Sequence, residues 1–214
     1  MNRSYPANRQ PFFLVAIVMM AIAFGVGYMA GSGGVNLISG LSPAGAPAAS
    51  EDGITVNFSP KGGCTERVVD EIDKAQREIE VQAFGFTLEP ISRALIAAHH
   101  RGVKVTIVLD KSDIKDSSET HAAEVAQDRI PTYIDAKHAI AHNKIILIDG
   151  QTIITGSFNF TNQAERSNAE NLLVLHGRPK LYAAYDANFK LHLGHSEPFT
   201  ADMAREPASS RSLR

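Results

Sequence analysis

The stretch "HNKIILIDGQTIITGSFN", residues 142–159, contains two apolar runs joined by a short polar turn. The runs, 144–149 and 152–157, are rich in isoleucine and threonine and are short enough for β-strands. Gly150 and Gln151 separate them, which predicts a tight β-hairpin. A hairpin of this kind brings the start of its first strand next to the end of its second.

Polar side chains stand at those two ends. His142 and Lys144 are two residues apart, as are Ser157 and Asn159, so each pair shares one face of its strand. An imidazole, a fixed positive charge, a hydroxyl and an amide together suit a phosphate group, with one nucleophile and three partners for its oxygens. Glu170 opens the next predicted strand, where its carboxylate would accept from one imidazole nitrogen and leave the other free to attack.

The remaining chain alternates strands and helices from residue 54 onward. Strands are predicted over 54–59, 79–86, 103–110, 131–135, 144–149, 152–157 and 170–176, and helices over 65–76, 89–102, 118–127 and 178–195. Alternating elements followed by a cluster of strands predict an α/β sandwich with a mixed sheet between helices.

The N-terminus has a different composition. Residues 12–30 carry no charge and would form about 28 Å of helix, close to the thickness of a bilayer core. Arg3 and Arg9 precede this segment and the next basic residue is Lys61, which places the N-terminus in the cytoplasm and the rest across the membrane. We therefore expect a transmembrane anchor or a signal peptide.

These patterns divide the chain into five parts. They are a cytoplasmic N-terminus (1–11), the anchor or signal peptide (12–30), a Gly/Ala/Pro-rich linker (31–53), a folded domain (54–196) and a flexible tail without periodicity (197–214).

Composition limits the possible chemistry. With 44% hydrophobic and 21% charged residues the chain is globular, and its net charge of −2 gives no general attraction for phosphates. Phosphate binding must therefore rest on a local pocket. The lone cysteine, Cys64, cannot form an internal disulfide and is expected to be a small buried residue near a helix start.

The order and spacing of the polar residues match the pattern H-x-K-x4-D-x6-G-S-x-N. In this pattern the chain resembles the phospholipase D superfamily. With "RGVKVTIVLD" before the pattern and "AENLLVL" after it, the domain over 54–195 resembles the small bacterial Nuc-type endonucleases of that superfamily.

The resemblance implies a role for each matching residue. His142 would be the nucleophile that forms a phosphohistidine, and Lys144 and Asn159 would bind the phosphate oxygens with help from Ser157. Glu170 would orient His142. Asp149 belongs to the signature, but its parity relative to Lys144 turns it to the other face of the strand, so we interpret it as mainly structural. The candidate catalytic residues are His142, Lys144, Asp149, Ser157, Asn159 and Glu170, of which Lys144, Ser157 and Asn159 also bind substrate.

The superfamily uses two signature copies per active site, and this chain has one. The resemblance therefore implies a homodimer with a shared active site. It implies no cofactor and no metal, because lysines and amides neutralise the phosphate, and we recognise no carboxylate cluster or Cys/His ligand set in the sequence. His138 is expected to be a loop residue, although it could line the mouth of the pocket, and His192 and His195 have no partner at catalytic spacing.

The resemblance implies a metal-independent phosphodiesterase, most similar to a nonspecific endonuclease acting on DNA or RNA. A phospholipase D that converts phosphatidylcholine-type lipids to phosphatidic acid is the first alternative. A non-catalytic membrane-anchored binding module is the second, although binding alone needs no nucleophile. The expected location is the bacterial inner membrane, with the domain on the periplasmic side, or outside the cell if the leader is cleaved.

Overall fold

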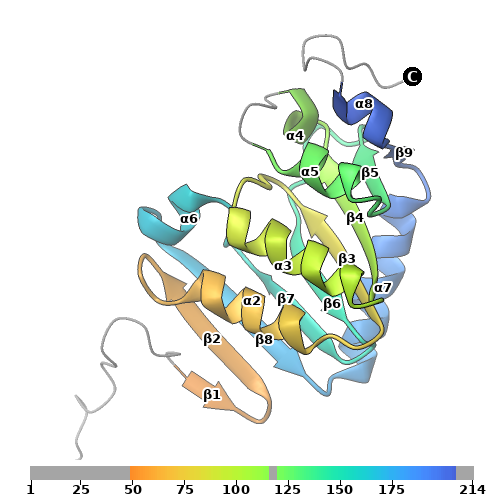
Figure 1. The fold of residues 1–214 in the computed structure, drawn as a ribbon. Helices are drawn as coiled ribbons and strands as arrows, with labels where there is room; N and C mark the ends of the chain where they lie inside the picture. Colours follow the sequence, from red (N-terminus) through yellow and green to blue (C-terminus); the bar gives the residue numbers. More distant parts are fainter. Residues whose placement is uncertain (1–48, 116–119, 206–214) are drawn as a thin grey trace, which may run out of the picture. The chain divides into compact units, whose positions relative to one another are not determined.

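A computed structural model describes residues 49–115 and 120–205 (Figure 1). The predicted N-terminus and anchor, and most of the linker, lie outside the described residues. No helix within the described ranges is long and apolar enough to cross a membrane.

A mixed sheet forms the centre of the described chain, with its strands in the order β1-β2-β8-β7-β6-β3-β4-β5-β9 (Figure 1). Strands β3, β4 and β5 are parallel, and the other neighbouring pairs are antiparallel. The strands are β1 Ala49–Glu51, β2 Ile54–Ser59, β3 Glu78–Ala83, β4 Lys104–Asp110, β5 Thr132–Asp135, β6 Lys144–Ile148, β7 Thr152–Gly156, β8 Glu170–His176 and β9 Glu197–Pro198.

Helices cover both faces of this sheet, as the sequence predicts. They are α2 Cys64–Lys74, α3 Glu89–His100, α4 Ser112–Lys115, α5 Ala122–Gln127, α6 Asn162–Arg166, α7 Pro179–Leu193 and α8 Ala201–Arg205. Apolar residues of α2, α3 and α5 join the larger core cluster on one face of the sheet. Helix α7 supplies Tyr182 and Phe189 to the smaller cluster on the other face.

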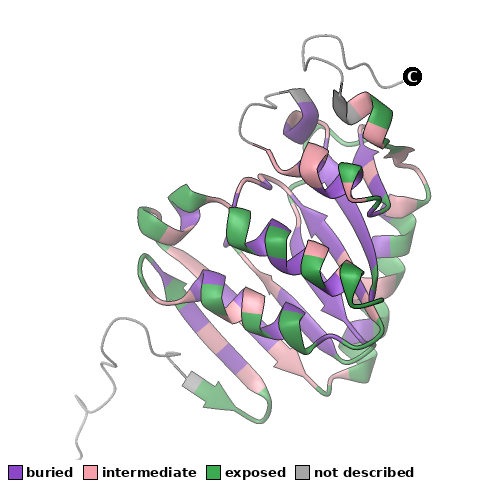
Figure 2. Ribbon diagram, viewed as in Figure 1, coloured by how far each residue is buried: buried purple, intermediate pink, exposed green. Residues whose placement is uncertain are grey.

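Strand β6 shows why the central strands are apolar on both sides. Ile146 and Ile148 belong to the larger cluster, whereas Ile145 and Leu147 belong to the smaller one. Every residue of β6 is buried, and its neighbours β3 and β7 are buried along most of their length (Figure 2). A strand with helices on both faces needs a continuous apolar run rather than an alternating one.

The β6–β7 hairpin forms as predicted, with Ile148 paired to Thr152. Its turn is centred one residue earlier than expected, because Asp149 and Gly150 have φ values of 56° and 77°. Left-handed conformations at both central positions match the twist of a hairpin, and Asp and Gly tolerate them well.

Residues 197–205 depart from the predicted flexible tail, whose remaining residues, 206–214, lie outside the described residues. Residues Glu197–Pro198 pair with β5 as β9, and Phe199 is buried, with its N–H donating to the Thr132 carbonyl at 2.8 Å. Helix α8 follows and packs against α5. Burial of one aromatic side chain supplies enough apolar contact to order a segment that lacks periodicity.

Candidate active site

One end of the sheet gathers all the predicted site residues except Asp149. Strand β6 begins at Lys144, β7 ends at Gly156 and β8 begins at Glu170, and these three strands are antiparallel neighbours. Antiparallel pairing places the start of one strand beside the end of the next. Strand β3 also ends here, with Ala83 opposite Lys144.

His142 and Lys144 share one aromatic neighbour. The exposed His142 imidazole lies against the Phe84 ring, with their centroids 4.7 Å apart, and the Lys144 ammonium lies 5.2 Å from the centroid of the same ring. Lys144 Nζ also donates a hydrogen bond of 2.9 Å to the His142 carbonyl. The lysine therefore holds the backbone that presents the imidazole.

Lys144 is buried, with 6% of the residue's surface exposed. Burial lowers its pKa below the ordinary value for lysine, while the carboxylates of Glu170 and Asp113 act in the opposite direction. The two carboxylates favour the charged form of Lys144, so its ammonium remains a donor that can receive a phosphate oxygen.

Asp113 is a site residue that the sequence analysis did not single out. Its buried carboxylate accepts hydrogen bonds from the Phe86 N–H at 2.8 Å and the Gly85 N–H at 3.2 Å. Burial and the nearby Asp110 raise the pKa of Asp113 to about 6, although the two N–H groups and Lys144 lower it. The carboxylate thus fixes the segment after β3 and interacts electrostatically with Lys144.

The "GSFN" segment turns sharply away from β7. Gly156 has φ 149°, and a Cβ there would lie 2.2 Å from the Asn171 carbonyl oxygen, so only glycine fits. The exposed Ser157 Oγ accepts a hydrogen bond of 3.1 Å from the Asn171 N–H. Phe158 is fully buried, which leaves Ser157 and Asn159 on the opposite side. The buried Oδ1 of Asn159 has no hydrogen-bond partner among the described residues.

Glu170 lies at the first position of β8, where its charge acts on Lys144. Its Oε1 accepts a hydrogen bond of 2.9 Å from Asn168, and within the described chain it makes no hydrogen bond to His142. The orienting contact between Glu170 and His142 therefore stays a prediction.

Asp149 lies at the opposite end of β6 from His142. Its carboxylate accepts hydrogen bonds of 2.8–2.9 Å from the backbone N–H groups of Gln76, Arg77 and Glu78. Burial raises the pKa of Asp149, but the three N–H groups outweigh it and hold the pKa below the usual value. Asp149 thus ties the hairpin to the α2–β3 connection, as its parity in the sequence suggested.

The arrangement contains one exposed imidazole, a buried ammonium and an amide at one end of the sheet. These groups can bind a phosphate and attack phosphorus, and the described chain supplies one imidazole, one ammonium and one amide for this purpose. Fold and site together therefore define the class of phosphodiester-cleaving α/β proteins with a histidine–lysine signature.

Comparisons with known proteins identify the family. Residues 68–193 match the family profile described as "Cardiolipin synthase, PLD-like domain", and the chain belongs to this phospholipase D-like family. It is 43% identical over 140 residues to the phospholipase D of Rickettsia prowazekii, a match that covers 65% of this chain and 67% of the relative. It is 33% identical over 126 residues to the mitochondrial cardiolipin hydrolase of Chlamydomonas reinhardtii, covering 58% and 54%.

Solved structures agree with this assignment. Nuc from Salmonella typhimurium, a phospholipase D family member, superposes with a TM-score of 0.66 at 35% identity, covering 69% of this chain and 97% of Nuc. NucT from Helicobacter pylori superposes with a TM-score of 0.60 at 19% identity, covering 68% and 99%, and shows the shared fold alone.

The predicted family and α/β fold are confirmed, and the relatives' names confirm the predicted class, phosphodiester hydrolases of the phospholipase D family. The chain spans 62–67% of the length of the Rickettsia proteins that it matches. Its own activity, substrate and partners are therefore matters for proposal.

Proposed function

We propose that this protein is a metal-independent phosphodiesterase that works through a phosphohistidine at His142. The observation that supports this most directly is the exposed imidazole of His142 beside the buried ammonium of Lys144, held there by the Lys144 bond to the His142 carbonyl. This geometry leaves the nucleophile open to solvent and fixes the cation that would meet the phosphate.

In the proposed reaction a ring nitrogen of His142 attacks phosphorus and the bond to the leaving oxygen breaks. A second histidine donates a proton to that oxygen, then removes a proton from the water that hydrolyses the phosphohistidine. Lys144, Ser157 and Asn159 would bind the non-bridging oxygens, where negative charge increases in the transition state. Glu170 would hold the imidazole in one tautomer.

We propose that the second histidine is His142 of a second copy of the chain. The single signature supports this, because two-histidine chemistry needs a partner. Two exposed apolar side chains beside the site also suit an interface between copies. Ile140, two residues before His142, is 57% exposed, and Phe58, on the strand next to β8, is 52% exposed.

The proposed substrate is nucleic acid, on the strength of the resemblance to Nuc-type endonucleases and the similarity to Nuc along 97% of its chain. A phospholipid is the second candidate, because the Rickettsia relatives are named phospholipase D. We propose that an anchor over 12–30 places the domain on the periplasmic side of the bacterial inner membrane. If this segment is cleaved as a signal peptide, the domain would be exported instead.

The test uses the full-length chain, with EDTA, on supercoiled plasmid and on phosphatidylcholine vesicles. Nicking that persists in EDTA and falls by at least about 1,000-fold in His142→Ala is expected. His100→Ala, which changes an exposed histidine of α3, is the matched control and should retain activity. Circular dichroism in the same buffer checks that each protein is folded.

Each other outcome decides between the alternatives. Choline release without nicking would replace the nuclease by a phospholipase D. The absence of both activities from folded protein would contradict the enzyme and favour a binding module. Full nicking by His142→Ala would refute the phosphohistidine mechanism.

A further inference from the structure

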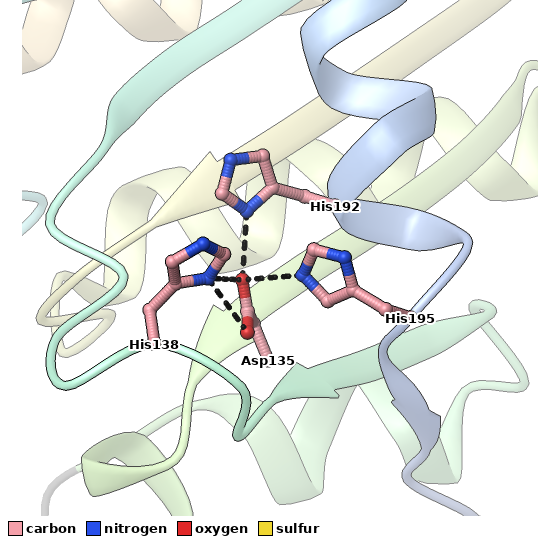
Figure 3. Close-up of side chains that lie close together, drawn as sticks. All are labelled: Asp135, His138, His192 and His195. Carbon is pink, nitrogen blue, oxygen red and sulfur yellow. Dashed lines mark hydrogen bonds and ion pairs between the residues drawn. The ribbon is translucent and has the colours of Figure 1, made fainter.

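Three histidines converge on one buried aspartate, and one of them lies in the loop that leads to His142. Asp135 ends β5 and His138 follows in the loop. His192 lies in the last turn of α7, and His195 lies two residues beyond the end of that helix (Figure 3). One ligand atom from each of the four side chains lies within 4.8 Å of all the others.

The contacts within this cluster are short and all point inward. Asp135 Oδ2 lies 2.7 Å from His192 Nδ1, 3.0 Å from His138 Nδ1 and 3.2 Å from His195 Nε2. The three rings come from two parts of the chain about sixty positions apart, yet each turns one nitrogen to the same oxygen (Figure 3). His192 and His195 achieve this because residues three apart lie on the same side of a helix end.

Those separations suit the coordination shell of a small cation. A tetrahedral ion with bonds of about 2.0–2.1 Å keeps neighbouring ligand atoms about 3.3 Å apart. The nitrogen–oxygen distances of 2.7–3.2 Å are slightly shorter than this value. The upper bound of 4.8 Å on the separations among the four ligand atoms is longer than it. Small side-chain rotations would therefore convert the hydrogen-bonded cluster into a coordination shell.

The donor types narrow the choice of metal. Three imidazole nitrogens and one carboxylate oxygen suit zinc, whereas magnesium and calcium prefer shells made of oxygen. Four protein ligands would complete a tetrahedron and leave no position for a substrate. Asp135 is fully buried and His192 is only 8% exposed, whereas the His138 side chain, 43% exposed, leaves one side of the cluster open to an entering ion.

We propose that Asp135, His138, His192 and His195 form a structural site for a divalent zinc-like ion. The sequence analysis found no Cys/His ligand set and expected no metal, because spacing along the chain does not show that these four residues meet. The proposed ion would take no part in the phosphodiester chemistry. The proposal therefore does not depend on the proposed function.

The site would connect α7 to the loop that presents the nucleophile. Only three residues separate His138 from His142, a span of at most about 14 Å. The same loop is held by Lys111, whose Nζ donates to the His138 carbonyl at 2.8 Å, and by Asp110, which accepts from the Ala141 N–H at 2.7 Å. An ion at the cluster would stabilise this loop and the end of α7 together.

The experiment measures metal content and thermal unfolding of the full-length chain. Purified protein should hold about one zinc ion per chain by elemental mass spectrometry, and added Co²⁺ should give the absorption of a tetrahedral site. Chelation should lower Tm by several degrees, and zinc should restore it.

His138→Gln and His195→Gln test the ligands without removing the most buried member of the cluster. Both should reduce bound zinc at least about tenfold and abolish the Tm response. His100→Gln is the matched control, because His100 also pairs with an aspartate, Asp128 at 2.8 Å, but outside the cluster. It should bind zinc normally.

Two results would overturn the proposal. Folded wild-type protein that holds no zinc and gives no Co²⁺ spectrum or Tm shift would show a cluster held by hydrogen bonds alone. Zinc binding that survives in both cluster variants would place the metal elsewhere. Neither result would bear on the His142 assay, which measures bond cleavage.

Discussion

Burial affects the ionisable residues of this chain in opposite ways, depending on what replaces water. The carboxylate of Asp149 meets three backbone N–H groups and its pKa falls, whereas Asp113 meets two and its pKa rises to about 6 beside Asp110. The pKa of Lys144 falls with burial, although two carboxylates oppose this. The hydrogen-bond donors and charges around each group, rather than its residue type, decide whether its pKa rises or falls.

The buried carboxylate of Glu80 lacks hydrogen bonds that would offset the loss of water around it. It lies on β3 facing α7, and its Oε2 is buried without a hydrogen-bond partner in the described chain. Burial, followed by the charges of Asp186 and Glu78, raises its pKa to about 7. Because the folded state holds the proton more tightly than the unfolded state, this residue's contribution to stability decreases as pH rises through about 7.

Glu80→Gln should therefore raise Tm at pH 8 and change it little at pH 5. Thermal unfolding followed by circular dichroism at both values measures the effect. Glu51→Gln, which changes an exposed residue of β1, should alter Tm equally little at both. A Glu80→Gln effect of the same size at pH 5 and pH 8 would contradict the assigned protonation.

At the scale of elements, Asp149 joins two connections that are distant in sequence. It occupies the β6–β7 turn and receives the backbone N–H groups that open β3, and the Arg77 side chain also bonds to its carbonyl. The aspartate of the signature thus sets the register of the hairpin relative to β3, and through β6 the position of Lys144.

Asp149→Asn should destabilise the protein by about 1–3 kcal/mol, because an amide cannot accept from all three N–H groups. Urea unfolding at pH 7 measures the loss, with Asp70→Asn on the exposed side of α2 as the control. The wild-type carboxylate has a lowered pKa, so its contribution is present above about pH 4 and disappears as pH falls further. An equal loss at pH 3 would refute the ionic account.

At the scale of the whole molecule, the described chain presents half of the proposed site. Mixed dimers of wild-type and His142→Ala chains, separated by two affinity tags, test this directly. Because each reaction would need both imidazoles, the mixed dimer should be at least about 100-fold less active than the wild-type dimer. Half of the wild-type activity, or full activity from a sedimenting monomer, would show that each chain is complete.

Much of the fold followed from local pattern. The apolar runs of β4 and β6 and the amphipathic α2 were recognisable because their periods reflect which sides face a core. Cys64 is fully buried at the start of α2, as expected. Residues 197–205 were missed because Phe199 is buried by contacts with distant elements rather than by a periodic pattern.

The sequence alone determined the family, the hairpin and the residues of the signature, because these depend on spacing within a short segment. Tertiary structure decided that Asp113 faces Lys144 and that Asp149 serves the α2–β3 connection. It also decided that His138, His192 and His195 meet at Asp135. The His-x2-His pair, which begins in the last turn of α7, was the available signal, but its partners lie far earlier in the sequence, on β5 and in the loop after it. Only folding brings such distant side chains within bonding distance.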